Sequence, residues 1–317
     1  MEKERAQAMW LPAAFLSAIF GAMATLVIKQ FVTETDSTLA TALRTCVVLA
    51  VSWLMTWRAG SAGTMGSLPL WSVVFIILSG ISTALSWLCY YRALTGGEAD
   101  KVMAIEKASI LMTLILAITI FGERSHLPVK LVGMGIMAGG LYLLASQNRA
   151  GAPAQKGESR GEKKDPWLAF AFMAAVFSSL NTVFSKLGVS VMDSNLATAV
   201  NTTVMMPVVW AVACWKMRPA AGQNSFADPG RNQKLTEVSR RELGWITVSG
   251  LATGACWLCY YYAVKYGPVS VVLPVNKLSV PIAVIYSYVA LGERMKRQEM
   301  AGITGIVFGM LTVAVLS

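Results

Sequence analysis

The sequence is poor in charged residues. Of its 317 residues only 14% are charged, whereas 55% are hydrophobic. A soluble globular domain carries about 25% charged residues, so this chain has too few of them to cover a surface that faces water. The composition therefore excludes a soluble domain and places the chain in a lipid bilayer.

Residues typical of catalytic and metal sites are also scarce. There is a single histidine, His126 in a predicted loop, and the apolar segments contain no HExxH motif, no Ser/His pairing and no paired carboxylates. Cys256 and Cys259 form one CxxC inside an apolar segment, which we interpret as small side chains at a helix contact. The sequence predicts no enzyme, no bound metal and no cofactor.

What the chain does contain is a series of apolar segments. Each is about 20 residues long, enough to cross roughly 30 Å of hydrocarbon as a helix. They cover approximately residues 10–30, 37–57, 71–94, 100–121, 127–146, 166–188, 194–216, 243–265, 269–291 and 298–316. We therefore predict an all-α polytopic membrane protein with ten transmembrane helices.

The chain repeats itself. The pattern of residues 86–124 returns at residues 256–294, with WLCYY and Gly-Glu-Arg in both copies, and LATAL (39–43) returns as LATAV (196–200). This predicts two five-helix repeats, residues 1–146 and 166–317, joined by a polar linker, residues 147–165. Because five is odd, the second repeat enters the membrane from the opposite side, and the two become inverted repeats of the kind that secondary transporters use.

The net charge of +10 reflects membrane topology. Most lysines and arginines outside the apolar segments lie in the linker and in the other loops on the same side. The positive-inside rule then places the linker in the cytoplasm and both termini outside. Because the basic clusters lie in loops beside membrane spans, we expect no nucleic-acid partner.

Comparison of the two copies indicates partners for the ionisable residues inside the spans. Arg44 in the second helix is matched by Asn201, and Glu106 in the fourth helix is matched by Asn276. Loss of one partner would leave a buried ion unpaired, whereas loss of both is tolerated. We therefore hypothesise that Arg44 and Glu106 form an ion pair, replaced in the second half by an amide pair between Asn201 and Asn276. The alternative is that the two losses are unrelated.

Two lysines and two aromatic clusters are kept in both copies, and we expect them to face one central cavity. Intramembrane ionisable groups are usually functional, and aromatic residues at i, i+3 and i+4 share one face of a helix. The alternatives are lysines satisfied by helix carbonyls and an aromatic belt at the membrane interface. The predicted substrate-binding residues are Trp87, Tyr90, Tyr91, Lys107, Trp257, Tyr260, Tyr261, Asn276 and Lys277.

Prolines and glycines add two further expectations. Pro274 and Pro281 interrupt the ninth helix, whereas the fourth helix has no proline at the matching positions. This difference favours the ninth helix as a moving gate. Two GxxxG pairs allow close helix packing, either in a homodimer or inside one protomer; they are Gly135 with Gly139 and Gly305 with Gly309.

With these features the chain resembles the EamA-type transporters of the drug/metabolite transporter superfamily. The WLCYY segments, LPVNKLSV (273–280) and the two Gly-Glu-Arg triplets carry the resemblance. The second half is similar to short, single-repeat members, so the chain looks like two such units fused. Those relatives carry an arginine and an acidic residue at the positions of Arg44 and Glu106. In the second half, Asn201 and Asn276 depart from this pattern.

The resemblance implies a secondary transporter of the bacterial inner membrane, often an exporter of amino acids, metabolites or toxic organic compounds. Ten-span members are commonly drawn with both termini in the cytoplasm, opposite to the charge distribution described above. From the intramembrane lysines we expect a small organic substrate with an anionic or carboxylate group. The alternatives are a flippase for a lipid or lipid-linked intermediate, and a structural or regulatory membrane protein.

Overall fold

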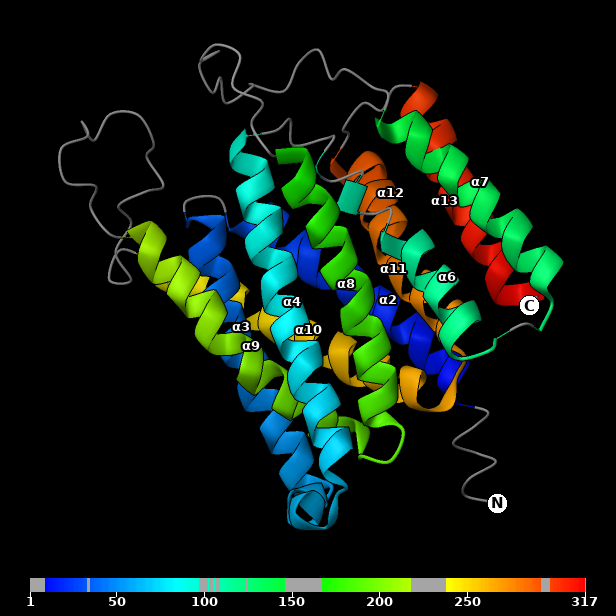
Figure 1. The fold of residues 1–317 in the computed structure, drawn as a ribbon. Helices are drawn as coiled ribbons and strands as arrows, with labels where there is room; N and C mark the ends of the chain where they lie inside the picture. The colour runs from blue at the N-terminus through cyan, green and yellow to red at the C-terminus, as the bar shows by residue number, and fades with distance from the viewer. Residues whose placement is uncertain are drawn as a thin grey trace.

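Apolar segments that cross a bilayer satisfy their backbone hydrogen bonds by becoming helices. The computed structural model describes residues 9–32, 35–96, 102, 105–106, 109–123, 125–145, 167–217, 238–291 and 297–316, and every regular element in these ranges is a helix. The elements are α2 (Trp10–Phe31), α3 (Ser37–Arg58), the short 3-10 helix η1 (Ser61–Ser67), α4 (Leu70–Gly96), α6 (Ser109–Ile120), α7 (Leu127–Ala145), α8 (Trp167–Val189), α9 (Ser194–Met217), α10 (Arg240–Tyr266), α11 (Val269–Lys277), α12 (Ser279–Leu291) and α13 (Arg297–Leu316) (Figure 1).

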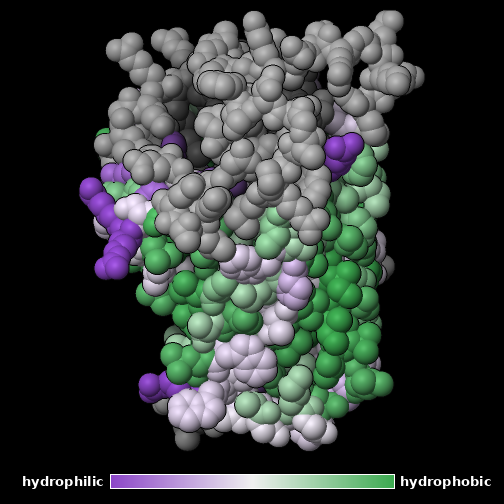
Figure 2. Space-filling model, turned by 90° about the vertical axis from the view of Figure 1, so that its left-hand side faces the viewer, coloured by the Kyte–Doolittle hydropathy of each residue, from purple (hydrophilic) through white to green (hydrophobic). Residues whose placement is uncertain are grey.

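The predicted membrane class is confirmed. Within the described ranges, six helices are long and apolar enough to span a membrane. Four shorter apolar helices lie in the other predicted spans, at Ser109–Ile120, Leu127–Gly140, Val269–Ala283 and Met300–Val313. The number of crossings, ten, stays a prediction. Figure 2 shows apolar side chains over the side of the molecule. Exposed residues such as Leu54, Ile81 and Leu251 would face lipid.

The same dipeptide starts equivalent helices in the two halves. Asp36 precedes α3, and its carboxylate accepts a hydrogen bond from the backbone N–H of Thr38 at 2.9 Å. Asp193 precedes α9 and accepts from the N–H of Asn195 at 3.0 Å. An aspartate at this position satisfies N–H groups that have no partner within the helix. The repeated Asp-Ser motif therefore acts as a helix start signal.

The two halves form equivalent helix pairs: when each helix is replaced by its counterpart in the other half, the same main pairs are found. α2 packs on α10, and its counterpart α8 packs on α4, the counterpart of α10. α3 packs on its own counterpart α9, and α7 on α13. The first helices of the two halves, α2 and α8, run in opposite directions in Figure 1. A two-fold relation between oppositely directed repeats produces this pattern. Five crossings in each half stay a prediction.

The ninth predicted span is two helices. α11 ends at Lys277 and α12 begins at Ser279, with Leu278 between them. Pro281 has no N–H to donate to the carbonyl of Lys277, which explains a break at this point. A gating role for Pro274 and Pro281 stays a prediction.

The two GxxxG pairs have different surroundings. Gly305 and Gly309 pack inside the protomer against α7, where a Cβ atom on Gly309 would meet the carbonyl oxygen of Gly133 at 2.7 Å. A Cβ atom on Gly135 or Gly139 would have nothing within 4 Å, so these two glycines face away from α13. Gly305 and Gly309 therefore serve helix packing inside one protomer. A homodimer through Gly135 and Gly139 stays a prediction.

Candidate functional site

A cavity of about 610 Å³ lies between the two halves. This volume is within the range of small-molecule sites, roughly 300–1,000 Å³. Of the described residues that line it, one, Leu273, is aliphatic. The lining residues are Thr25, Thr41, Arg44, Thr83, Ser86, Trp87, Tyr90, Tyr91, Glu106, Ser109, Thr113, Ser178, Asn181, Thr182, Asn201, Cys256, Trp257, Tyr260, Tyr261, Leu273, Asn276 and Lys277.

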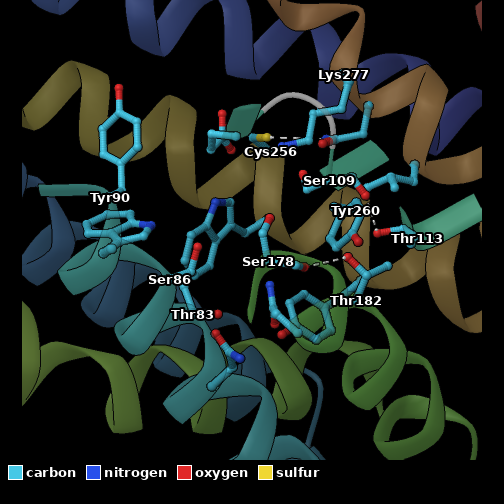
Figure 3. Close-up of a pocket in the computed structure, with 18 of the residues that line it drawn as sticks. Thr83, Ser86, Tyr90, Ser109, Thr113, Ser178, Thr182, Cys256, Tyr260 and Lys277 are labelled. Atoms are coloured by element: carbon cyan, nitrogen blue, oxygen red, sulfur yellow. Dashed lines mark hydrogen bonds between the residues drawn. The ribbon is translucent and has the colours of Figure 1, made fainter. Parts of the chain in front are cut away.

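All six predicted aromatic residues line this cavity. In the first half, the rings of Tyr90 and Tyr91 lie 6.0 Å apart at 65°. In the second half, the rings of Tyr260 and Tyr261 lie 5.8 Å apart at 88°. Edge-to-face pairs are a favourable arrangement of aromatic rings. The two copies of WLCYY therefore build matching walls on α4 and α10, and Figure 3 shows Tyr90 and Tyr260 on different sides of the cavity.

Two cationic residues and one acidic residue are found among the described lining residues. Arg44 on α3 comes from the first repeat, and Lys277 on α11, labelled in Figure 3, comes from the second. Glu106 lies on the segment before α6 and lines the same cavity. The predicted ion pair between Arg44 and Glu106 stays a prediction. Lys107 lies outside the described residues.

The predicted amide pair between Asn201 and Asn276 is wrong. The Nδ2 of Asn201 donates to Ser79 Oγ at 2.8 Å, and the Nδ2 of Asn276 donates to Ser17 Oγ at 2.9 Å. Both asparagines line the cavity but belong to different hydrogen-bond clusters. A neutral amide needs no counter-charge, so each one bonds to the nearest hydroxyl on a neighbouring helix.

Ser79 is the centre of the larger cluster. Its Oγ lies 2.6 Å from Asn181 Oδ1, 2.8 Å from Ser185 Oγ and 3.4 Å from the hydroxyl of Tyr261. The cluster joins α4, α8, α9 and α10 at one wall of the cavity, which its members Asn181, Asn201 and Tyr261 line. Buried polar networks of this kind rigidify a site when each member is satisfied.

Sequence reasoning missed the hydroxyl groups of the cavity. Serine and threonine side chains occur throughout apolar spans, so their presence alone does not predict a site. One signal was present, because Thr25 and Thr182 occupy matching positions of the two repeats and both line the cavity. The remaining hydroxyls come from α3, α4, α6 and α8, and Figure 3 labels Thr83, Ser86, Ser109, Thr113 and Ser178.

The fold and the cavity together define a class of protein. Oppositely directed helical repeats that enclose a polar cavity at their interface are the architecture of membrane carriers for small solutes.

Comparison with known proteins identifies the family within this class. The sequence model of the EamA-like transporter family matches residues 8–146 and 165–315. The chain belongs to the EamA-like transporter family and is a multi-pass membrane transporter.

Two known proteins are similar to this chain. An uncharacterized transporter in the cobO 3' region of a Sinorhizobium species is 34% identical over 149 residues, which make up 47% of this chain and 96% of that protein. That relative is therefore about one repeat long. A solved structure, described only as a crystal structure of a protein, has a TM-score of 0.70 and 17% identity and covers 98% of this chain and 97% of that chain. At this identity the likeness shows the fold alone.

Proposed function

We propose that the protein is a secondary active transporter of the bacterial inner membrane that exports a small organic metabolite by alternating access. The observation that carries the proposal is the cavity between the two repeats, which presents a cation from each of them. Arg44 and Lys277 outnumber Glu106 among its described ionisable residues. An excess of positive charge in a low-dielectric site favours an anionic or zwitterionic substrate.

The lining residues also suggest how such a substrate is held. A carboxylate accepts hydrogen bonds from guanidinium and ammonium groups, while the hydroxyls of serine and threonine accept or donate as the substrate requires. The aromatic walls on α4 and α10 supply apolar contact area with a polar edge. The substrate is therefore a compact molecule with several polar groups.

A lipid flippase is the weaker candidate. A second, apolar pocket adjoins the cavity and shares Thr41, Trp87 and Tyr91 with it. Its volume is about 10 Å³, which is room for about one water molecule. An acyl chain needs a much longer apolar groove, so the cavity suits a water-soluble substrate better than a lipid.

Flux into liposomes tests this function. Purified protein is reconstituted, and uptake of labelled organic anions and amino acids is measured with and without an imposed proton gradient. We expect saturable flux of at least one anionic or zwitterionic compound, and Lys277→Ala should lower it on the order of tenfold or more by removing a charge-assisted contact. Lys29→Ala is the matched control, because Lys29 is exposed and does not line the cavity.

The two possible failures have different meanings. Flux of neutral or cationic compounds only, or flux unchanged by Lys277→Ala, would overturn the proposed substrate class. Transfer of fluorescent lipids between leaflets without solute flux would instead support the flippase.

A further inference from the structure

The turn between α10 and α11 is held by a carboxylate from the other repeat. Glu123, which follows α6, accepts hydrogen bonds from the backbone N–H groups of Val269 and Ser270, each at 2.8 Å and each to a different carboxylate oxygen. The first N–H groups of a helix lack partners within it and carry partial positive charge. Glu123 of the first repeat therefore caps a helix of the second repeat.

A lysine holds the other side of the same turn. The Nζ of Lys186 on α8 donates to the carbonyl oxygens of Val264 at 2.6 Å and Gly267 at 2.7 Å. The last carbonyls of a helix lack partners within it and attract cations. An anion and a cation therefore together satisfy the two helix ends that flank one turn.

A second lysine supports Glu123. Lys130 on α7 is 1% exposed, and its Nζ donates to the backbone carbonyl oxygen of Glu123 at 2.8 Å. We call Glu123, Lys130 and Lys186, with the turn of residues 264–270, the latch. It joins α6, α7, α8, α10 and α11. The ends of α6 and α8 and the turn between α10 and α11 lie at the lower right of Figure 1.

The latch lies at one end of the central cavity. Along α10 the lining residues reach Tyr261, and along α11 they begin at Leu273. The turn between these two points is buried, with Val269 and Ser270 both 0% exposed. A solute that leaves the cavity in this direction would have to pass the turn.

Equivalent lysines of the two repeats have different surroundings. Lys29 occupies the position in the first repeat that Lys186 occupies in the second, and Lys29 is exposed whereas Lys186 is half-buried. Inverted repeats that alternate access adopt unequal conformations, because one end of the site closes while the other opens. The buried turn and the half-buried Lys186 are what a carrier closed at the latch end would show.

We propose that the latch is the gate that closes the cavity at this end, and that Glu123 opens it by leaving the N-terminus of α11. The proposal rests on the transport function proposed above and deepens it by naming a gate for the same cavity. Release of Glu123 exposes the N–H groups of α11 to water and frees the turn to move. Glu123 is a positioning residue, since it does not line the cavity.

Ser270 offers a position from which to measure opening. Its side chain is fully buried, and its Oγ has no hydrogen-bond partner, so cysteine fits there at little cost. In protein whose five native cysteines are replaced by alanine, Ser270→Cys is treated with a membrane-impermeant maleimide added to both sides of liposomes. We expect slow labelling with Glu123 present and labelling on the order of tenfold faster with Glu123→Gln, which loses the charge and one acceptor oxygen. Lys186→Gln should act in the same direction.

Two matched variants serve as controls. Glu242 is a buried carboxylate in the first turn of α10, at the opposite end of that helix, and accepts a hydrogen bond from Thr35. Glu242→Gln and Lys29→Gln should leave the labelling rate unchanged. All variants are compared only after they elute like the parent protein in size-exclusion chromatography.

The outcomes separate the gate from the transport function. The gate would be overturned if neither Glu123→Gln nor Lys186→Gln made labelling faster. It would also be overturned if Glu242→Gln made labelling faster to the same extent. Faster labelling with unaltered flux in Glu123→Gln would also overturn it and leave transport standing. Absence of flux in the parent protein would overturn the function, and the labelling rates would then still decide whether the latch closes this end.

Discussion

At the scale of residues, the asparagines of the cavity show how a neutral group changes its partners. Asn201 and Asn276 stand where the first repeat has Arg44 and Glu106, but they do not pair with each other. A buried ion has to meet an opposite charge, whereas an amide is satisfied by any donor or acceptor. Loss of both charges therefore frees each position to join a local cluster.

Removal of the hydroxyl at the centre of the larger cluster should destabilise the fold. Ser79→Ala takes away the acceptor of Asn201, which is 1% exposed, and a partner of Asn181. A buried polar group left without its partner costs about 1–3 kcal/mol, so we expect a clearly lower thermal unfolding temperature in detergent. Ser52→Ala is the control, because Ser52 is equally buried but donates only to Val48 of its own helix at 2.7 Å. Equal losses in the two variants would contradict the prediction.

At the scale of elements, close contact between helices depends on which face carries the glycines. α7 has several glycines, but Gly133 and Gly140 face α13, whereas Gly135 and Gly139 do not. Without a Cβ atom, two backbones approach closely enough for van der Waals contact to hold them in lipid. The GxxxG spacing alone did not identify the face that makes the contact.

The same substitution at two glycines of α7 should have opposite effects. A Cβ atom on Gly133 would lie 2.5 Å from Val313 Cγ2 and 2.9 Å from the carbonyl oxygen of Gly309, whereas one on Gly135 would meet nothing within 4 Å. Gly133→Ala should therefore lose about 1–3 kcal/mol through overpacking. Gly135→Ala should be neutral or slightly stabilising, since alanine favours a helix over glycine by roughly 1 kcal/mol. Thermal unfolding of both variants in one detergent measures the contrast, and a loss at Gly135 as large as at Gly133 would argue against this packing.

At the scale of the whole molecule, exchange of the two halves preserves the helix pairs but not every contact. α2 with α10 and α8 with α4 are equivalent pairs. Lys186 and Lys29 are equivalent residues in unequal surroundings. The proposed alternating access would use this near-equivalence, since two conformations of similar free energy let a substrate select between them.

The predicted topology can be tested with reporter fusions. Ten crossings place both termini on one side of the membrane and the linker, residues 147–165, on the other, and the charge distribution places the linker inside. Alkaline phosphatase fused after residue 317 should therefore be active, and the same reporter inserted within the linker should be inactive. The reverse result would support the orientation commonly drawn for the family, and equal activities would exclude ten crossings.

The sequence by itself determined the membrane class, the repeat, the six aromatic residues of the cavity and the place of Lys277 in its lining. Composition and helix periodicity are properties of the chain, and duplication marks which positions both halves kept. Only the tertiary structure decided the partners of Asn201 and Asn276, the inward glycines of α7 and the cap that Glu123 places on α11. Each of these depends on which helices are neighbours and how they are rotated, and no single helix carries that information in its own residues.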